Sequence, residues 1–252
     1  MSWIEQLKRL FVRAQAPGRA AAVVAAAGSS SRMGGVNKLL LEIDGTPVIV
    51  HTLRALSAAP SIEAVILVCR SEDMAEFGRL CRQYELEKVV KIVRGGANRT
   101  QSVLRGVEEA GRDFAILAVH DGARPLVLPE QVEAVVEKAR QTTAAALAVP
   151  VTDSVQRVEG GVAVENIDRA TIWAMQTPQA FDRDLLFAAL TRAVEEGAPV
   201  TDECGAVQAL GTGVSIVEGS YQNRKITTPE DIWVAESILA EREGTDAHWT
   251  GI

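Results

Sequence analysis

Short apolar runs alternate with segments of helical periodicity along most of this chain of 252 residues. The apolar runs occupy residues 20–27, 62–69, 89–93, 114–119 and 145–151, and helical spacing marks residues 47–58, 72–84, 99–110 and 129–142. Strands that alternate with helices predict one Rossmann-like, mostly parallel sheet with helices on both faces. In such an α/β sheet, ligands bind beyond the carboxyl ends of the strands.

The second half of the chain interrupts this alternation. Residues 153–164 carry alternating valines around Gly160-Gly161, which predicts a protruding β-hairpin. A lone hairpin is marginally stable in water, so it packs either against its own domain or against another subunit. The remaining elements are predicted as helices at residues 182–196, 202–210 and 229–240, and a strand at residues 214–217.

A glycine and three serines follow the first apolar run, at Gly28 and residues 29–31, and two cations come next, Arg32 and Lys38. A loop without bulky side chains lets backbone N–H groups approach a polyphosphate, and the cations neutralise further charge. The loop is not a P-loop, because Leu39 follows the lysine, and serines replace the second glycine of a dinucleotide fingerprint. The alternative is an ordinary turn with solvated cations.

Polar clusters punctuate five predicted strand ends or loops, at residues 28–38, 95–102, 120–124, 201–203 and 223–225. They hold four candidate cations: Arg32, Lys38, Arg124 and Lys225. No nucleophile lies near a base in the sequence. Convergent cations and loop amides without a nucleophile favour direct transfer of a phosphoryl or nucleotidyl group.

Charge and composition exclude several classes of function. The formal net charge of −7 argues against a nucleic-acid or anionic-membrane binder, so an anion site must be a local positive pocket. The three cysteines and three histidines are dispersed, which argues against a zinc site and predicts free thiols in a reducing, cytoplasmic compartment. No apolar run is long enough for a membrane span.

The chain divides into a main domain at residues 20–243, with an arm at about 152–168, and two terminal segments. Residues 1–19 have helical apolar spacing and end in a Pro17-Gly18 breaker. They are interpreted as a short amphipathic helix that contacts a membrane surface or a partner, or as a locally docked or disordered extension. Residues 244–252 form a short C-terminal tail.

The ordered set of motifs resembles one known family over about residues 20–240. The motifs are Ala26-Ala27-Gly28 with Arg32-Met33-Gly34 and Lys38, Gly95-Gly96 with Arg99 and Ser102-Val103, His120-Asp121-Gly122-Ala123-Arg124-Pro125, Thr177-Pro178-Gln179, Thr201-Asp202-Glu203 and Lys225-Ile226-Thr227. They are similar to those of the 2-C-methyl-D-erythritol 4-phosphate cytidylyltransferases, which have a nucleotidyltransferase (GT-A-like) fold. The resemblance implies cytidylyl transfer from CTP to methylerythritol phosphate, giving 4-diphosphocytidyl-2-C-methyl-D-erythritol and pyrophosphate, in the non-mevalonate isoprenoid route.

The resemblance also implies roles for individual residues. The catalytic group would be Arg32, Lys38 and Lys225, and CTP would be held by Ala26, Ala27, Gly28, Gly96, Ser102 and Asp121. The acceptor would be held by Asp121, Arg124, Thr201 and Lys225, with Ser154 and Arg169 reaching it from the partner's arm in a homodimer. Mg²⁺, or another divalent cation, would be held mainly by the triphosphate.

Four positions depart from the family pattern. Ala97 stands where an acidic residue is common, which leaves base discrimination to Ser102 and the main chain. Asn37 and Leu39 replace the frequent proline and glutamine beside the lysine, and Ser154 replaces a frequent threonine while keeping the hydroxyl.

Structural roles remain open for several of these residues. Arg124 and Lys225 are alternatively surface cations, and Asp121 caps a turn. His120 is interpreted as a packing residue and not as a base. Thr201 is also a candidate helix cap, with Asp202-Glu203 as a dipole pair in the first turn. Thr201 is kept as a site residue, and the two acidic residues are interpreted as capping residues.

Two other functions remain open. A ribitol 5-phosphate cytidylyltransferase shares the loop and the fold, but valine is frequent there at the position of Ala123. A catalytically silent nucleotidyltransferase-like protein would have no need to keep the cations together. A glycosyltransferase would need an Asp-x-Asp metal pair, which is absent from the predicted strand ends.

Overall fold

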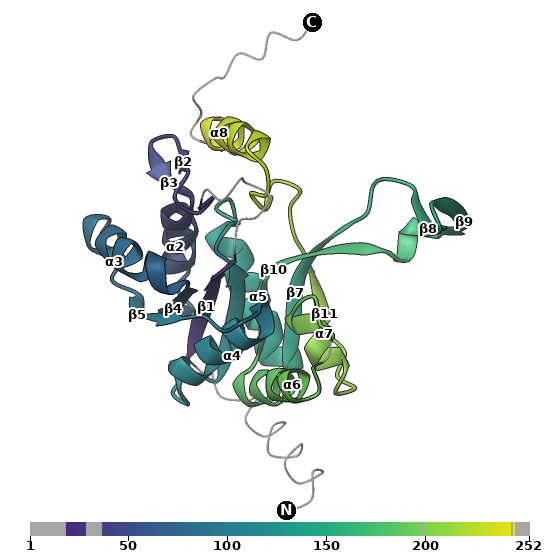
Figure 1. Cartoon of the computed structure of the whole chain (residues 1–252), viewed down its shortest axis with the longest axis horizontal. Coiled ribbons are helices and arrows are strands. Elements are labelled where there is room, and N and C mark those ends of the chain that lie inside the picture. Colours follow the sequence, from purple (N-terminus) through teal and green to yellow (C-terminus); the bar gives the residue numbers. More distant parts are fainter. Residues whose placement is uncertain (1–18, 29–36, 198, 243, 245–252) are drawn as a thin grey trace, which may run out of the picture.

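The computed structural model describes residues 19–28, 37–197, 199–242 and 244. A seven-stranded sheet in the order β11-β7-β10-β6-β1-β4-β5 forms its centre (Figure 1). The strands are β1 (Ala20–Ala26), β4 (Ile62–Cys69), β5 (Val89–Arg94), β6 (Ile116–Asp121), β7 (Ala144–Pro150), β10 (Trp173–Asp182) and β11 (Ser215–Glu218). Neighbouring strands run parallel except at β10, which is antiparallel to β6 and β7. The predicted fold class is therefore confirmed.

Helices connect the strands in the predicted alternation. They are α2 (Val48–Ala58), α3 (Met74–Gln83), α4 (Arg99–Ala110), α5 (Pro129–Thr142), α6 (Arg183–Glu195), α7 (Glu203–Gln208) and α8 (Glu230–Arg242). Short 3₁₀ turns are η2 (Ser71–Asp73) and η3 (Arg169–Thr171), and β2 (Glu42–Ile43) pairs with β3 (Thr46–Pro47) in a small ribbon. The bounds of α4, α5 and β4 are those predicted from the sequence.

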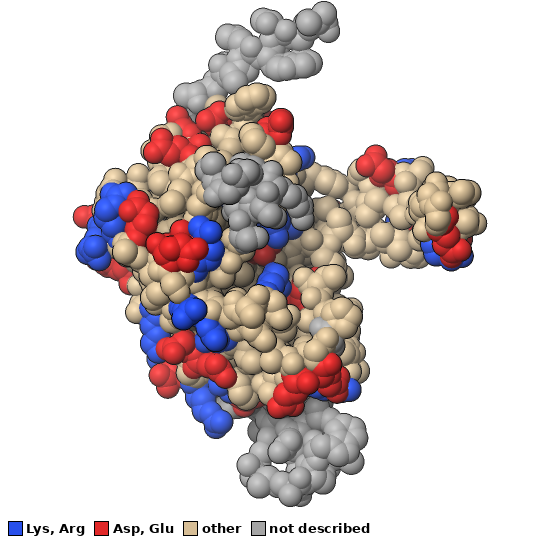
Figure 2. Space-filling view, in the orientation of Figure 1, with Lys and Arg blue, Asp and Glu red and all other residues tan. Residues whose placement is uncertain are grey.

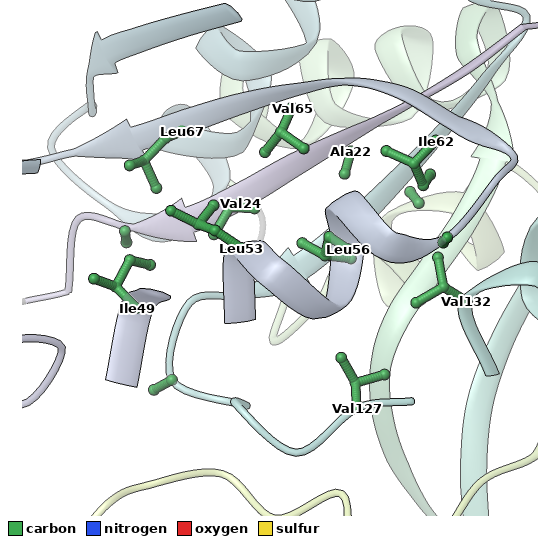
Figure 3. Packing of buried hydrophobic residues seen from close by; sticks show 14 of the residues in the cluster. Ala22, Val24, Ile49, Leu53, Leu56, Ile62, Val65, Leu67, Val127 and Val132 are labelled. Carbon is green, nitrogen blue, oxygen red and sulfur yellow. The ribbon is translucent and has the colours of Figure 1, made fainter. Parts of the chain in front are cut away.

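The sheet separates two buried hydrophobic layers. Successive side chains of a strand point to opposite faces, so Ala22 and Val24 of β1 join one layer while Ala21 and Val23 join the other. Figure 3 shows the first layer, where Leu53 of α2 packs among residues of β1 and β4. Helices α2, α3, α5 and α8 contribute to this layer, and α4, α6 and α7 to the other. A strand buried on both faces explains the continuous apolar run of β1.

Helix α4 lies unusually close to the sheet. A Cβ atom added at Gly106 would come within 2.4 Å of Val23 and 2.8 Å of Val68. Glycine at this position therefore lets the first turn of α4 reach the carboxyl ends of the strands, where the site is expected.

Strand β10 was not predicted from the sequence. Pro178 lies within it, and proline inside a run argues against a central strand because it lacks an N–H donor. The structure accommodates the proline because the pairing of β10 with β7 is interrupted between Met175 and Gln179, and pairing with β6 begins only at Gln179. The irregular segment frees the side chains of Gln176 and Thr177 for the polar network described below.

The predicted hairpin is present as β8 (Val155–Glu159) and β9 (Val162–Ile167), which pair with each other. It stands away from the body of the molecule as an arm (Figure 1). Its valines are largely exposed: 58% for Val158 and 64% for Val162. The structure therefore does not show the hairpin packed against its own domain, which was one of the two alternatives.

The described surface agrees with the composition. Figure 2 shows basic and acidic side chains interspersed over one face of the body. No helix in the described ranges is long and apolar enough to cross a membrane. Cys69, Cys81 and Cys204 are free thiols. The amphipathic prediction for residues 1–19 lies outside the described residues except for Arg19, and Gly244 is the one described residue of the tail.

Candidate active site

The carboxyl ends of β1, β4, β5 and β6 share one edge of the sheet, because these strands run parallel. A cavity of about 360 Å³ opens there, within the size range of small-ligand sites. Its lining comprises Ala25, Ala26, Ala27, Gly28, Lys38, Leu39, Gly96, Ala97, Asn98, Arg99, Ser102, Asp121, Ala123 and Lys225. Eight of the predicted site residues are thus brought together: Ala26, Ala27, Gly28, Lys38, Gly96, Ser102, Asp121 and Lys225.

Four described site residues, Arg124, Thr201, Ser154 and Arg169, do not line this cavity, and a fifth predicted residue is not described. Arg32 lies outside the described residues. Arg124 lies behind Asp121, and Thr201 is exposed beyond the lining. Ser154 and Arg169 lie near the root of the arm and are exposed, with the Arg169 guanidinium donating to the carbonyl of Thr152 at 2.5 Å.

The loop between β5 and α4 forms one wall of the cavity. Asn98 caps α4, since its side-chain oxygen accepts from the N–H of Gln101 at 2.9 Å. A Cβ at Gly95 would come within 2.6 Å of Ala27, and one at Gly96 within 2.4 Å of Gln101. The two glycines are required because the loop passes so close to β1 and α4.

The Ser102 hydroxyl is already engaged by this loop. It donates to the carbonyl of Asn98 at 2.7 Å and accepts from the N–H of Gly96 at 3.0 Å. Its single proton is therefore used, and toward the cavity it can offer only a remaining lone pair. At Ala97, which lacks the acidic side chain, the backbone N–H donates to the Gln101 side chain at 3.0 Å.

Asp121, at the end of β6, is surrounded by cations. Its carboxylate lies 2.9 Å from Lys225 Nζ, 3.4 Å from Arg99 and 3.5 Å from Arg124 Nε. Burial by itself raises the pKa of Asp121, but the charges of Lys225, Arg99 and Arg124 outweigh burial and hold that pKa well below its usual range. Asp121 is therefore an acceptor of hydrogen bonds and not an acid.

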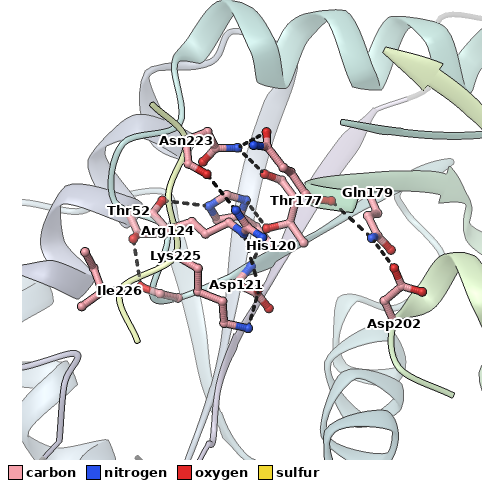
Figure 4. A network of polar contacts seen from close by, with 12 residues as sticks. Thr52, His120, Asp121, Arg124, Thr177, Gln179, Asp202, Asn223, Lys225 and Ile226 are labelled. Carbon is pink, nitrogen blue, oxygen red and sulfur yellow. Dashed lines mark hydrogen bonds and ion pairs between the residues drawn. The ribbon is translucent and has the colours of Figure 1, made fainter. Parts of the chain in front are cut away.

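His120 supports Asp121 from behind (Figure 4). Burial lowers the pKa of His120 to about 4, so the ring is neutral at physiological pH. Its Nε2 lies 3.1 Å from the carbonyl of Arg124, which can only accept, so Nε2 carries the proton. Its Nδ1 then accepts from the Thr177 hydroxyl at 3.1 Å, and the same hydroxyl accepts from the N–H of Asp121 at 3.0 Å. The prediction that His120 packs at the strand end is confirmed.

The segment from Asn223 to Ile226 forms the opposite wall. The Lys38 ammonium donates to the carbonyl of Ile226 at 2.7 Å, and the N–H of Ile226 donates to Ala123 at 2.8 Å. The Arg124 guanidinium donates to the carbonyl of Asn223 at 2.7 Å. Arg124 is thus neither an exposed surface cation nor a lining residue, because its side chain is buried between Asp121 and this segment.

One cavity thus brings together Gly28 and Lys38, a buried aspartate contacted by three cations, and a tight glycine loop. A family model for 2-C-methyl-D-erythritol 4-phosphate cytidylyltransferase (IspD) matches residues 20–241. The chain belongs to this family. This membership confirms the predicted 2-C-methyl-D-erythritol 4-phosphate cytidylyltransferase function over the ribitol 5-phosphate and silent alternatives.

Individual relatives agree with this family assignment. The 2-C-methyl-D-erythritol 4-phosphate cytidylyltransferase of Bacillus licheniformis is 43% identical over 227 residues, covering 90% of this chain and 97% of the relative. That of Halalkalibacterium halodurans is 42% identical over 222 residues, covering 88% and 97%. The crystal structure of 4-diphosphocytidyl-2C-methyl-D-erythritol synthase from Anaerococcus prevotii matches with a TM-score of 0.79 at 27% identity, covering 88% of this chain and 96% of that one. The cytidylyltransferase structure from Thermus thermophilus matches with a TM-score of 0.73 at 30% identity, covering 87% and 98%.

In this member of the cytidylyltransferase family, an ion pair that the sequence did not predict completes the cavity wall. The Arg99 guanidinium contacts both carboxylate oxygens of Glu203, at 2.6 and 3.0 Å, and reaches Asp121. Burial disfavours a charged Arg99, but the charges of Glu203 and Asp121 raise its pKa above the ordinary value. The signal in the sequence is a cation in the first turn of a helix, where the dipole disfavours it.

The prediction of how α7 begins needs a correction. Asp202, and not Thr201, caps α7, because its carboxylate accepts from the N–H of Gly205 at 3.0 Å. Glu203 is not a solvated dipole partner, since its side chain is 1% exposed and bound to Arg99. The cap is assigned to Asp202 because its side chain is one residue nearer the helix than that of Thr201.

The cytidylyltransferase cavity offers few ligands for a metal ion. No group of three or more histidines, cysteines or acidic residues that could hold a metal occurs in the described part of the chain. Asp121 is the carboxylate in the lining, and Lys225, Arg99 and Arg124 already neutralise it. These residues fit an ion that takes most of its ligands from a substrate and water.

Proposed function

We propose that this cavity binds CTP and 2-C-methyl-D-erythritol 4-phosphate and transfers the cytidylyl group between them. One observation carries the assignment of sites: Asp121, ringed by Lys225, Arg99 and Arg124, lines the same cavity as the Gly28 loop and Lys38. Family membership provides the activity, and the cavity supplies an anion-binding half and a hydroxyl-binding half side by side.

The triphosphate lies, in this proposal, against the end of β1. Backbone N–H groups of Ala27 and Gly28 approach it because Gly28 has nothing within 4 Å of its missing Cβ. Lys38 is fixed by the carbonyl of Ile226 and adds a cation at the cavity wall. Arg32, six residues before Lys38, supplies the second cation of the loop in this proposal.

The cytosine lies against the glycine loop. Because its proton is donated to Asn98, the Ser102 hydroxyl can only accept a hydrogen bond from the base. The exocyclic amino group of cytosine is a donor that fits this acceptor. Gly96 offers its backbone to the same base edge. The absence of a carboxylate at Ala97 makes the Ser102 hydroxyl the side-chain group assigned to base selection.

The acceptor lies at Asp121 and Lys225. The buried, ionised Asp121 accepts hydrogen bonds from hydroxyl groups of the ribose and of the acceptor, and Lys225, whose side chain is 40% exposed, binds the acceptor phosphate. Arg124 holds Asp121 from behind. Thr201 lies at the rim, next to the capped start of α7, and donates its hydroxyl to the phosphate in this proposal.

The reaction needs no protein nucleophile. An oxygen of the acceptor phosphate attacks the α-phosphorus of CTP, a new P–O bond forms, and the bond to the β-phosphate oxygen breaks as pyrophosphate leaves. The acceptor phosphate is already ionised, so no base has to remove a proton. Arg32, Lys38 and Lys225 stabilise the negative charge that accumulates around the α-phosphorus.

A divalent cation belongs to this proposal. When bound together with the triphosphate, Mg²⁺ would supply charge neutralisation and orientation. Asp121 is the lining carboxylate nearest to this role, and the cations around it favour binding of the ion through the phosphates and water.

We further propose that the arm joins two copies of the chain. Its exposed valines and its separation from its own domain support a second subunit as the surface that covers it. Ser154 and Arg169, at the root of the arm, then reach the acceptor phosphate of the partner subunit. The free thiols support a reducing, cytoplasmic location.

The test is a substrate comparison with purified protein. CTP, Mg²⁺ and 2-C-methyl-D-erythritol 4-phosphate should release pyrophosphate, and ribitol 5-phosphate in its place should not. Replacing Mg²⁺ by a chelator should stop the reaction. Release with ribitol 5-phosphate alone, or no release with either acceptor, would overturn the proposed function.

A further inference from the structure

Arg99 occupies a position that electrostatics disfavours. It is the first residue of α4, where the helix dipole and the free N–H groups repel a cation, and the first turn of α4 has no acidic residue to offset this. A carboxylate from elsewhere in the chain is needed to keep the guanidinium there. Glu203, 104 residues later, supplies it.

The Glu203 carboxylate accepts two hydrogen bonds from the Arg99 guanidinium. Arg99 Nη1 donates to Oε1 at 2.6 Å, and Nη2 donates to Oε2 at 3.0 Å. The same Nη2 is 3.4 Å from Oδ1 of Asp121, which is a longer and weaker contact. The guanidinium therefore belongs mainly to Glu203 and only marginally to Asp121.

Glu203 is itself fixed in place. The preceding Asp202 caps α7 and accepts from Gln179 Nε2 at 2.9 Å, while the N–H of Cys204 donates to Gln179 Oε1 at 3.2 Å. The residues on both sides of Glu203 are thus tied to β10. Because the carboxylate cannot follow Arg99, it holds the guanidinium at one place in the wall.

We propose that Glu203 is a positioning residue that keeps Arg99 from taking over the carboxylate of Asp121. Lys225 contacts Asp121 through Oδ2 at 2.9 Å, and this pairing places the ammonium beside the cavity. Without Glu203, Arg99 keeps Asp121 as its carboxylate partner and competes with Lys225 for it. This inference rests on the proposed function, in which Lys225 binds the acceptor phosphate.

The variant Glu203→Gln tests the inference because it keeps the shape of the side chain and removes the charge. We expect the KM for methylerythritol phosphate to rise and kcat to fall, with a combined loss on the order of ten- to a hundredfold in kcat/KM for the acceptor. The KM for CTP should rise less than the KM for the acceptor, because Lys38 and Gly28, which hold the triphosphate in this proposal, do not contact this pair. Only the contact of Asp121 with the ribose is shared. Steady-state pyrophosphate release with each substrate varied in turn separates the two constants.

The double variant Arg99→Gln, Glu203→Gln sharpens the test. It removes the competing guanidinium together with its partner, so Asp121 is left to Lys225, and the acceptor KM should return toward the wild-type value. It also serves if the single variant does not fold, because removing both charges leaves no unpaired buried charge. If both variants fold, an acceptor KM in the double variant as high as in Glu203→Gln would overturn the inference. If only the double variant folds, an acceptor KM far above the wild-type value would overturn it.

A second ion pair provides the matched control. Arg70 contacts Asp73 through two nitrogens at 2.7 and 3.1 Å, and Asp73 is 8% exposed. Asp73→Asn should lower thermal stability while both KM values remain at the wild-type level. Suppose that the wild-type protein is active and that Glu203→Gln also lowers thermal stability without changing either KM. The ion pair of Arg99 and Glu203 is then only structural, and the inference is wrong. An inactive wild type would instead overturn the proposed function.

Discussion

The cavity at the carboxyl edge and the arm are built in opposite ways. At the cavity, the charged groups of Asp121 and Glu203 are buried, and each is held by partners from distant parts of the chain. Along the arm, β8 and β9 pair with each other, and polar side-chain contacts such as Gln156 with Asn166 join its own two strands. Figure 2 shows the arm separated from the body, with charged side chains at its end.

This difference shows which part of the site one chain can complete alone. Buried charges are costly unless their partners are in place, so the network around Asp121 must be assembled when the chain folds. The arm carries exposed valines that remain to be covered. The cavity is therefore preorganised within one chain, whereas the proposed contribution of Ser154 and Arg169 would require a second one.

The largest effect is expected at the phosphate cations of the cavity. Lys38→Ala should lower kcat on the order of a hundredfold or more, because it removes a donor to the charge that develops in the transition state. Arg32→Ala should have a loss of similar size. Pyrophosphate release at saturating substrates measures both. Near-normal turnover in either variant would remove that residue from the mechanism, and the charge change Arg157→Ala on the arm is the control.

A hydroxyl deletion probes the buried network next. Thr177→Val should lower the free energy of unfolding by about 1–3 kcal/mol, because the N–H of Asp121 and Nδ1 of His120 lose their partner. Val158→Ser on the arm should change monomer stability by no more than about 0.5 kcal/mol, since that side chain is exposed. Urea unfolding of both variants measures the contrast. Equal losses would contradict the difference drawn between the two regions.

Shortening the arm tests its dependence on a second chain. Deletion of residues 156–162 should weaken dimerisation by at least about tenfold, roughly 1.4 kcal/mol, and weaken binding of the acceptor. The thermal unfolding midpoint of the shortened monomer should stay close to that of the full chain, because β8 and β9 pair with each other and the hairpin adds little to the core. Sedimentation equilibrium reports the association. A fully active monomer would show that the arm does not complete the site, and replacement of Val158, Val162 and Val164 by serine tests the same surface without a deletion.

A gradual pH dependence of stability is expected from His120. Its pKa is lowered to about 4 in the folded protein, so the unfolded chain binds more protons between about pH 6.5 and pH 4. Stability is therefore complete above that window and falls as the pH decreases through it, by at most about 1.4 kcal/mol per pH unit for one proton. Denaturant unfolding at pH 7, 6 and 5 gives the free energy of unfolding at each pH. This free energy should change less steeply with pH in His120→Asn than in wild type. An unchanged slope would contradict a buried neutral ring.

Most of the fold could be predicted from the sequence because periodicity records burial. Strands such as β4 are buried on both faces, so their composition marks their ends, as at Ile62 and Cys69. Strand β10 escaped prediction because Gln176 and Thr177 serve the polar network, and Pro178 lacks an N–H for a regular ladder. Polar side chains in a strand remove the hydrophobic pattern by which strands are found.

The residues of the site also differ in how far they could be predicted from the sequence. Asp121 and Lys38 could be predicted because they follow strands at the edge where parallel sheets bind ligands. Glu203 could not, because a glutamate in the first turn of a helix is commonplace and nothing local indicates a partner 104 residues away. Contacts that depend on how the starts of two distant helices meet in space leave no local trace in the sequence.

Strand β10 runs from the root of the arm into the core and carries Thr177 and Gln179 on the way. Its neighbours Ala180 and Phe181 pack in different hydrophobic layers. Insertion or loss of one residue between Trp173 and Ala180 would exchange these layers or shift the arm against the site. The length of this segment is therefore constrained more tightly than its composition, and related chains should vary here by substitution and not by insertion or deletion.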